Sequence, residues 1–193
     1  PKPQNPNCLE LDLNLMQKQI VLSAALLAGA NAKMSFGKCP DVQNMETFDK
    51  SAYAGLWYEI ERDPMFPFTM GSSCTFKDFT LDSNGDLELW FGAYQPMMFS
   101  YSGVSGMMYC DESMDETCEA TMNETGDARA PFGILATDYE TYDIGYYCMD
   151  MIENVMKAEF VMVYSKSQEM SDETKQVVKD IINEKVPSYN YDW

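Results

Sequence analysis

The chain has 193 residues, the length of about one domain by the usual prior of roughly 150 residues, and a globular composition of 46% apolar and 23% charged residues. Asp and Glu number 31 against 13 Lys and Arg, and the resulting net charge of −18 excludes nucleic acid and anionic lipid surfaces as principal partners. Histidine is absent, which excludes Ser/His/Asp and Cys/His catalysis and imidazole zinc sites.

The first apolar segment, residues 20–30, is too short to span a bilayer, which takes about 20 residues. Met16 and Lys18 precede it, and Ala30-Asn31-Ala32 follows it, in the small-polar-small pattern of a signal peptidase site. We interpret residues 16–32 as the signal peptide of a secreted, extracellular protein; the alternative is a buried helix of the domain. Residues 1–15 are then translated upstream sequence or a cloning remnant, and residues 33–193 form a single domain with its core at about 37–186.

After a loop-like segment at residues 34–47, short apolar and aromatic segments alternate with turn residues. They predict eight strands, at residues 56–60, 75–81, 87–94, 101–110, 118–124, 132–138, 142–149 and 158–165. Asn84-Gly85 between the second and third strands fits the positive-φ positions of a tight hairpin. Ser171 then caps a helix that carries its apolar residues at helical spacing and ends at Pro187.

This order predicts an all-β fold, an eight-stranded antiparallel up-and-down barrel with one C-terminal α-helix packed outside. An eight-stranded barrel has an interior just wide enough for one small ligand. The barrel geometry, rather than any catalytic residue, therefore points toward a binding function.

Two motifs make the sequence specific. Gly55-Leu56-Trp57 at the start of the first strand resembles the opening motif of the lipocalin family, and Thr137-Asp138-Tyr139 resembles the turn between its sixth and seventh strands. Gly37-Lys38-Cys39-Pro40 and Cys148 resemble most the apolipoprotein D and insect bilin-binding branch. The resemblance covers about residues 37–186. The family's third motif is an Arg after the eighth strand, where this chain has Lys166.

The motif residues also have physical roles of their own. Gly55 allows a tight turn into the strand because it lacks a Cβ. Trp57 offers a large apolar plate for the closed end of the barrel, and its indole N–H needs a hydrogen-bond partner. Asp138 can accept backbone N–H bonds in its turn. Lys166 keeps a cation–π contact with the Trp but lacks the planar stack of a guanidinium.

The resemblance implies a secreted binding and transport protein that holds a small hydrophobic ligand, such as a fatty acid, sterol, retinoid or tetrapyrrole, in a cup closed at the Trp57 end. It implies no cofactor and no metal. Strand alternation predicts an inner face made of Phe79, Leu81, Leu87, Leu89, Phe91, Met107, Tyr109, Ala120, Met122, Leu135, Phe160, Met162 and Tyr164. The alternative is a filled barrel without a ligand.

Lys77 is the one charged residue on the predicted inner side of the second strand. Because a buried charge needs a partner, its ammonium can bind the carboxylate of a ligand. The alternatives are that Lys77 lies at the mouth of the cup or pairs with an Asp or Glu.

Residues 33–193 contain five cysteines, and secretion favours disulfides. The resemblance implies a bond between Cys39 and Cys148. A hairpin around the acidic residues 111–117 brings Cys110 and Cys118 within bonding distance of each other. Cys74 is then unpaired, since the branch bonds its counterpart to a later cysteine that this chain lacks. The alternative pairs Cys74 with Cys110 or Cys118.

Two other functions remain open. One is a lipid-isomerising enzyme that uses a cavity thiol such as Cys74, which requires a depressed thiol pKa. The other is an interaction protein whose acidic surface and aromatic tail, residues 189–193, dock on a basic partner. The sequence names neither the ligand nor the oligomeric state.

Overall fold

The computed structural model describes residues 34–63, 71–110, 118–123, 129–153, 155–189 and 191. The predicted upstream segment (1–15), the predicted signal peptide (16–32) and the acidic loop at 111–117 lie outside these residues. None of the helices in the described ranges is long and apolar enough to cross a membrane.

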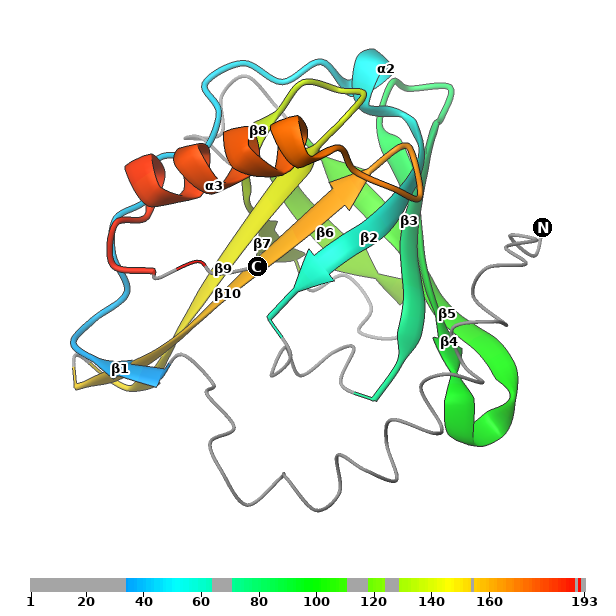
Figure 1. Ribbon diagram of the computed structural model, residues 1–193. Helices are drawn as coiled ribbons and strands as arrows, with labels where there is room; N and C mark the ends of the chain where they lie inside the picture. The colour runs from blue at the N-terminus through cyan, green and yellow to red at the C-terminus, as the bar shows by residue number, and fades with distance from the viewer. Residues whose placement is uncertain are drawn as a thin grey trace.

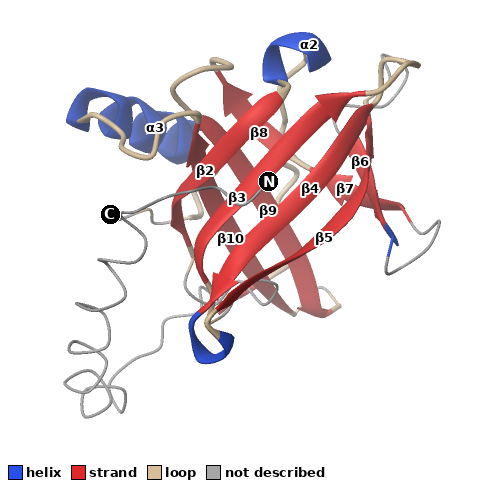
Figure 2. Ribbon diagram, turned by 90° about the vertical axis from the view of Figure 1, so that its right-hand side faces the viewer, coloured by secondary structure: helices blue, strands red, loops and turns tan. Residues whose placement is uncertain are grey.

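Ten strands form one antiparallel sheet that curls into a barrel (Figures 1 and 2). The strands are β1 (Met34–Phe36), β2 (Gly55–Arg62), β3 (Ser73–Leu81), β4 (Leu87–Gln95), β5 (Ser100–Tyr109), β6 (Cys118–Met122), β7 (Arg129–Phe132), β8 (Ile134–Thr137), β9 (Asp143–Ile152) and β10 (Met156–Ser165). The helices are α2 (Lys50–Tyr53), the 3₁₀ turn η1 (Pro96–Met98) and α3 (Asp172–Lys185). The predicted all-β barrel with one C-terminal helix is confirmed.

A kinked strand closes the barrel. The sheet order runs β7-β6-β5-β4-β3-β2-β10-β9-β8, and only Gly133 separates β7 from β8 along the chain. A Cβ at Gly133 would lie 2.9 Å from the carbonyl oxygen of Tyr146, which explains a glycine at the kink. Counted as one strand, β7 and β8 complete the eight predicted barrel strands.

The sequence did not predict β1, which lies in the segment expected to be a loop. Residues Met34 to Phe36 pair with Ala158 to Met156 of β10. The pairing of β2 with β10 ends at Arg62 and Met162, so β1 continues the hydrogen bonding along the same edge of β10.

Helix α3 covers the outer face of β8, β9 and β10, as Figure 1 shows. The Ser171 side chain accepts a hydrogen bond from the Thr174 N–H and caps the helix, as predicted. Val178 and Ile182 are fully buried against the strands. The helix therefore supports the barrel wall from outside and leaves the interior free.

The C-terminal segment also packs on the barrel. Tyr189 and Tyr191 are 4% and 5% exposed, and their hydroxyls donate to Asp63 and Glu61 at 3.1 and 3.3 Å. The interaction-protein hypothesis is therefore wrong for these two rings, which are not free to dock on a partner; residues 190, 192 and 193 of the predicted tail lie outside the described residues. Sequence pattern alone could not tell a tail that binds its own barrel from one that binds a partner.

Both predicted disulfides are present, Cys39–Cys148 and Cys110–Cys118, with Cα separations of 5.8 and 4.3 Å. Cys74 is also disulfide-bonded, and no described cysteine is free. The prediction of an unpaired Cys74 is wrong. It came from the resemblance, since the branch bonds the counterpart of Cys74 to a later cysteine that this chain lacks, and from an odd count of five cysteines in residues 33–193, whereas the whole sequence has six.

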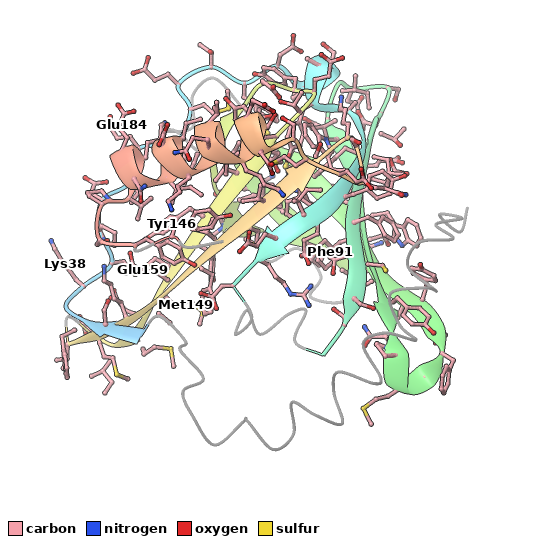
Figure 3. The ribbon with its side chains drawn as sticks, viewed as in Figure 1. Lys38, Phe91, Tyr146, Met149, Glu159 and Glu184 are labelled. Carbon is pink, nitrogen blue, oxygen red and sulfur yellow. A yellow bond between two sulfur atoms is a disulfide. The ribbon has the colours of Figure 1, made fainter. Side chains whose placement is uncertain are left out.

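A buried ion pair lies on the outer face of β10. Lys157 Nζ is 2.7 Å from Glu159 Oε2, and the Tyr146 and Ser188 hydroxyls donate to Glu159 Oε1. Figure 3 shows Tyr146 and Glu159 close together beneath α3. Burial opposes ionisation of Glu159, but these hydrogen bonds outweigh it and hold its pKa below the ordinary value of 4.5.

Because the pKa of Glu159 is lower in the folded than in the unfolded protein, its ionisation stabilises the fold above about pH 4.5, and this contribution disappears as the pH falls through the folded-state pKa. We expect Glu159→Gln to flatten the loss of stability below that pH. The measurement is urea unfolding from pH 7 to pH 3, with Glu184→Gln on α3 as a control that removes the same charge from an exposed position. An unchanged slope in Glu159→Gln would contradict the prediction.

Candidate functional site

Two clusters of buried side chains distinguish the inner and outer faces of the barrel. The first cluster contains side chains from β2 to β6, β8 and β10, which surround the barrel, so it lies inside. Its members are Tyr53, Trp57, Phe79, Leu87, Leu89, Met108, Cys118, Ile134 and Tyr164. The other includes the buried residues of α3 and lies outside; its strand members are Leu135, Ile144, Tyr146, Val161 and Val163. Alternate residues of each strand belong to one face, so these clusters place the remaining side chains.

Trp57 forms the floor of the barrel. It is fully buried, and its indole N–H donates to the Tyr53 carbonyl oxygen at 2.8 Å. Lys166 Nζ lies 5.1 Å from the Trp57 ring centre and donates to the carbonyl oxygens of Ala52 and Ala54. Lys166 thus keeps the predicted cation–π contact and also ties β10 to the residues on either side of the end of α2.

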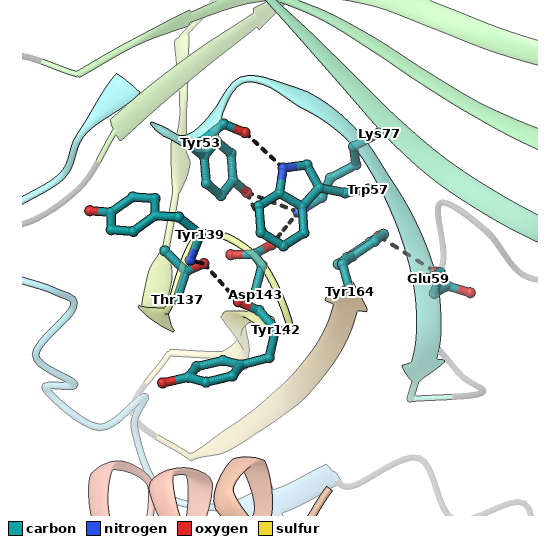
Figure 4. Close-up of polar contacts among 9 residues, drawn as sticks. All are labelled: Tyr53, Trp57, Glu59, Lys77, Thr137, Tyr139, Tyr142, Asp143 and Tyr164. Atoms are coloured by element: carbon teal, nitrogen blue, oxygen red, sulfur yellow. Dashed lines mark hydrogen bonds and ion pairs between the residues drawn. The ribbon is translucent and has the colours of Figure 1, made fainter. Parts of the chain in front are cut away.

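A buried ion pair lies directly above this floor (Figure 4). Lys77 Nζ of β3 is 2.6 Å from Asp143 Oδ2 of β9, and the Tyr53 hydroxyl donates to the same oxygen at 3.0 Å. The side chains of Lys77 and Asp143 are 5% and 0% exposed. The structure thus agrees with one of the alternatives that the sequence left open for Lys77, namely pairing with an Asp.

Aromatic rings enclose the Lys77 ammonium. Its Nζ is 3.8 Å from the Tyr164 ring centre and 5.4 Å from that of Phe132, with Phe79 and Tyr53 at 5.9 Å. Burial lowers the pKa of Lys77, and the adjacent carboxylate offsets part of that shift. Burial, followed by the same carboxylate, raises the pKa of Tyr53. Lys77, Asp143 and the Tyr53 hydroxyl therefore form one buried cluster of interacting polar groups that aromatic rings enclose.

A second charged pair lies on the inner wall nearer the open end. Arg62 Nη1 is 2.5 Å from Glu59 Oε1 and donates to Thr75 Oγ1 at 2.9 Å, while Nη2 donates to the Ser72 carbonyl oxygen at 2.7 Å. Both face inward because the β2–β10 register shifts by one residue at Ile60. Burial raises the pKa of Glu59, and Arg62 offsets part of that shift.

The interior differs between its two halves. Near the floor the buried members of the inner cluster are at most 5% exposed and pack against one another. Farther along the strands several inner side chains remain partly exposed, namely Phe91, Val104, Met122, Tyr147, Met149 and Met162. Among the described residues, the core therefore fills the closed half of the barrel, and solvent reaches side chains of the open half.

Eight of the eleven predicted ligand-contacting residues lie on the inner face. They are Lys77, Phe79, Leu89, Phe91, Met122, Phe160, Met162 and Tyr164. Of these, Lys77, Phe79, Leu89 and Tyr164 belong to the packed closed half. Phe91, Met122, Phe160 and Met162 line the open half.

The other three predicted positions are wrong. Met107 pairs with Glu88, and it is Met108 that faces Leu87 inside. Tyr109 lies on the same outer side, where the Arg129 guanidinium stacks 4.3 Å from its ring centre. Because Met107 and Met108 are both apolar, the sequence of β5 does not show which of the two faces the interior.

Leu135 is likewise an outer residue. It is fully buried beneath α3 together with Val178 and Ile182. Its apolar character reflects the core between helix and sheet rather than the interior of the barrel.

The sequence analysis missed several inner residues of the open half, among them Glu59, Arg62, Thr75, Tyr147 and Met149. One signal was present for Tyr147: Cys148 bonds to Cys39 outside the barrel, so its neighbour must face inward. No such signal existed for Arg62, because a bulge reverses the alternation just before it.

The described residues contain neither a metal-binding group nor a free thiol. No group of three or more Cys, Asp and Glu within the described ranges is placed to hold a metal ion. The enzyme alternative required a free cavity thiol such as Cys74, but Cys74 is disulfide-bonded and no described cysteine is free to act as a nucleophile.

No protein-family model matches the chain. Apolipoprotein D of Bos taurus is 30% identical over 171 residues, covering 81% of this chain and 82% of its own length. The chain is a lipocalin. The bilin-binding protein of Pieris brassicae is 26% identical over 183 residues, covering 86% and 87% of the two chains. This lipocalin thus belongs to the apolipoprotein D and insect bilin-binding branch.

Solved structures agree on the fold. Insecticyanin of Manduca sexta superimposes with a TM-score of 0.66 at 22% identity, covering 78% of this lipocalin and 80% of insecticyanin. The family motifs take their expected places: Gly55 has φ +116° at the turn into β2. Asp138 accepts the backbone N–H groups of Glu140, Thr141 and Tyr142 in the β8–β9 turn.

The Lys77–Asp143 pair can be tested by removing one partner or both. We expect Lys77→Met to lower the free energy of unfolding by about 3–5 kcal/mol, because it leaves the Asp143 carboxylate buried without its cation. Lys77→Met/Asp143→Leu should recover most of this loss, since apolar side chains can replace a buried ion pair. Urea unfolding measures both.

The control for this test is Lys50→Met, which breaks the partly exposed pair with Asp86 (side chains 29% and 30% exposed) and should cost less than about 1 kcal/mol. Equal destabilisation by the single and double variants would contradict a mutual neutralisation of Lys77 and Asp143.

Proposed function

We propose that this lipocalin is a secreted binding and transport protein that holds one small hydrophobic ligand in the open half of its barrel. The observation that carries the proposal is the division of the interior, with a packed floor above Trp57 and partly exposed apolar side chains farther along the strands. An interior of this kind binds apolar molecules by removing their surface from water.

The proposed ligand contacts are the inner residues of the open half: Phe91, Val104, Met122, Tyr147, Met149, Phe160 and Met162. They combine three aromatic rings with three methionines, whose flexible thioethers adapt to ligands of different shape. The floor beneath the ligand contains Phe79, Leu89, Lys77 and Tyr164. The name of the bilin-binding relative is consistent with a tetrapyrrole among the ligand classes, beside fatty acids, sterols and retinoids.

Secretion is part of the same proposal. Two disulfides between described cysteines favour an oxidising compartment, and residues 16–32 have the pattern of a signal peptide. The strongly negative charge supports a small molecule rather than a nucleic acid as the partner.

The binding site can be tested with N-phenyl-1-naphthylamine, a neutral probe that fluoresces in apolar surroundings. We expect saturable binding to the wild-type protein and binding weakened about three- to tenfold in Met122→Ala, since the loss of its inner apolar surface is worth roughly 1 kcal/mol. Met107→Ala is the matched control, because Met107 lies on the adjacent strand and faces outward. Absence of saturable fluorescence, or equal weakening by the two variants, would count against the proposed cup.

A further inference from the structure

The charges inside the barrel cancel in pairs. Among the described residues, the cations that face the interior are Lys77 and Arg62, and each lies against its own carboxylate, at 2.6 Å from Asp143 and 2.5 Å from Glu59. No inward-facing cation of the described part is therefore left to neutralise a charged ligand. A ligand carboxylate bound inside has to compete with Asp143 or Glu59.

The two pairs differ in their accessibility. Lys77 and Asp143 are 5% and 0% exposed and closed in by the rings of the floor. Arg62 and Glu59 are 16% and 10% exposed. Arg62 is also paired across the sheet with Met162, a partly exposed residue of the open half. A ligand that enters the cup therefore meets the Glu59–Arg62 pair first.

The Glu59–Arg62 pair is held in place by the barrel wall. Thr75 and the Ser72 carbonyl oxygen accept hydrogen bonds from Arg62, and the Tyr164 hydroxyl donates to Glu59 at 3.5 Å. The inner side chains that β9 and β10 contribute to the open half are apolar or aromatic, namely Tyr147, Met149, Phe160 and Met162. The described interior thus has a polar strip along β2 and β3, beside the apolar and aromatic side chains of the neighbouring strands β10 and β9.

We infer that this cup prefers neutral lipophiles with a hydroxyl or amide group over lipophiles that end in a carboxylate, and that Glu59 and Arg62 form the subsite for that polar group. The inference rests on the proposed function and names the ligand class for it. A hydroxyl both donates and accepts, so it can bond to the Glu59 carboxylate and the Arg62 guanidinium without separating them.

A carboxylate can only accept hydrogen bonds. To reach Arg62 it has to displace Glu59 or lie beside it as a second buried anion, and both arrangements cost free energy. The net charge of −18 adds a repulsive field for any anion. A ligand carboxylate at Lys77, which the sequence analysis considered, meets the same obstacle at Asp143.

The test compares ligands that share an apolar body and differ in the polar group: retinol with retinoic acid, and dodecanol with dodecanoic acid. Each competes with bound N-phenyl-1-naphthylamine at neutral pH. We expect each alcohol to bind at least about tenfold more tightly than its acid, a difference of roughly 1.4 kcal/mol.

Glu59→Gln provides the decisive variant. Gln keeps the size of the side chain and one acceptor oxygen, has an NH₂ donor in place of the other oxygen, and removes the anion, so Arg62 becomes available to a ligand carboxylate. We expect the acids to bind about tenfold more tightly than to wild type, and the alcohols to change by less than about threefold. Glu88→Gln, at an exposed position on the outer face of β4, removes the same charge and should leave both affinities unchanged.

The outcomes separate the two proposals. If the probe fails to bind wild-type protein, the proposed function fails. If the probe binds but the acids compete as well as the alcohols, or neither alcohol displaces it, the inferred selectivity is wrong and the cup stands. If Glu59→Gln leaves the preference unchanged, or Glu88→Gln shifts it equally, Glu59 and Arg62 are not the subsite.

Discussion

A buried charge must be neutralised where it lies, and in this protein that constraint joins the two sides of the barrel. Lys77 comes from β3 and Asp143 from β9, and the Tyr53 hydroxyl bonds to both from α2. Low polarity makes the attraction between them strong and the loss of either partner costly. The strands and α2 are therefore held in one arrangement around Trp57, and the floor of the cup is set by electrostatics as much as by packing.

This floor decides what the other half of the barrel can do. Because Asp143 neutralises Lys77 and aromatic rings enclose it, Lys77 bounds the interior above the floor without presenting a free charge to it. The polar groups that remain near the open half are those of Glu59 and Arg62, which are themselves paired. A cup with two self-neutralising pairs suits a molecule that is apolar over most of its surface and uncharged at its polar end.

The sequence predicted the barrel well because its signals are local. Alternation, the Asn84-Gly85 turn and the Ser171 cap each depend on a few neighbouring residues, and the structure contains all eight barrel strands and the helix. The faces of individual strands were harder to predict. Met107 and Met108 give no alternation, although the Cys110–Cys118 bond carries the missing information: Cys118 faces inward with Ala120, so Cys110 and Met108 do as well.

Other features could not be read from the sequence because they depend on distant partners. Asp143 is one of 31 acidic residues, and only the closed barrel selects it as the partner of Lys77. The bulge at Ile60 that turns Arg62 inward is a property of strand pairing. Similarly, the sequence does not show that α3 covers β8. Leu135, which was predicted to contact the ligand, belongs instead to the core between α3 and the sheet.

The Cys39–Cys148 bond makes a covalent ring of the chain that includes β2 to β8 and the first part of β9. A protease that cuts any single peptide bond inside this ring leaves two fragments that remain one molecule until the disulfide is reduced. A cut after Cys148 instead separates β10 and α3 from the ring. Strand β10 pairs with β1, β2 and β9, and helix α3 covers the outer wall of the barrel. The loops within the ring can therefore be nicked without loss of covalent integrity, whereas the turn between β9 and β10 is the place where one cleavage divides the barrel.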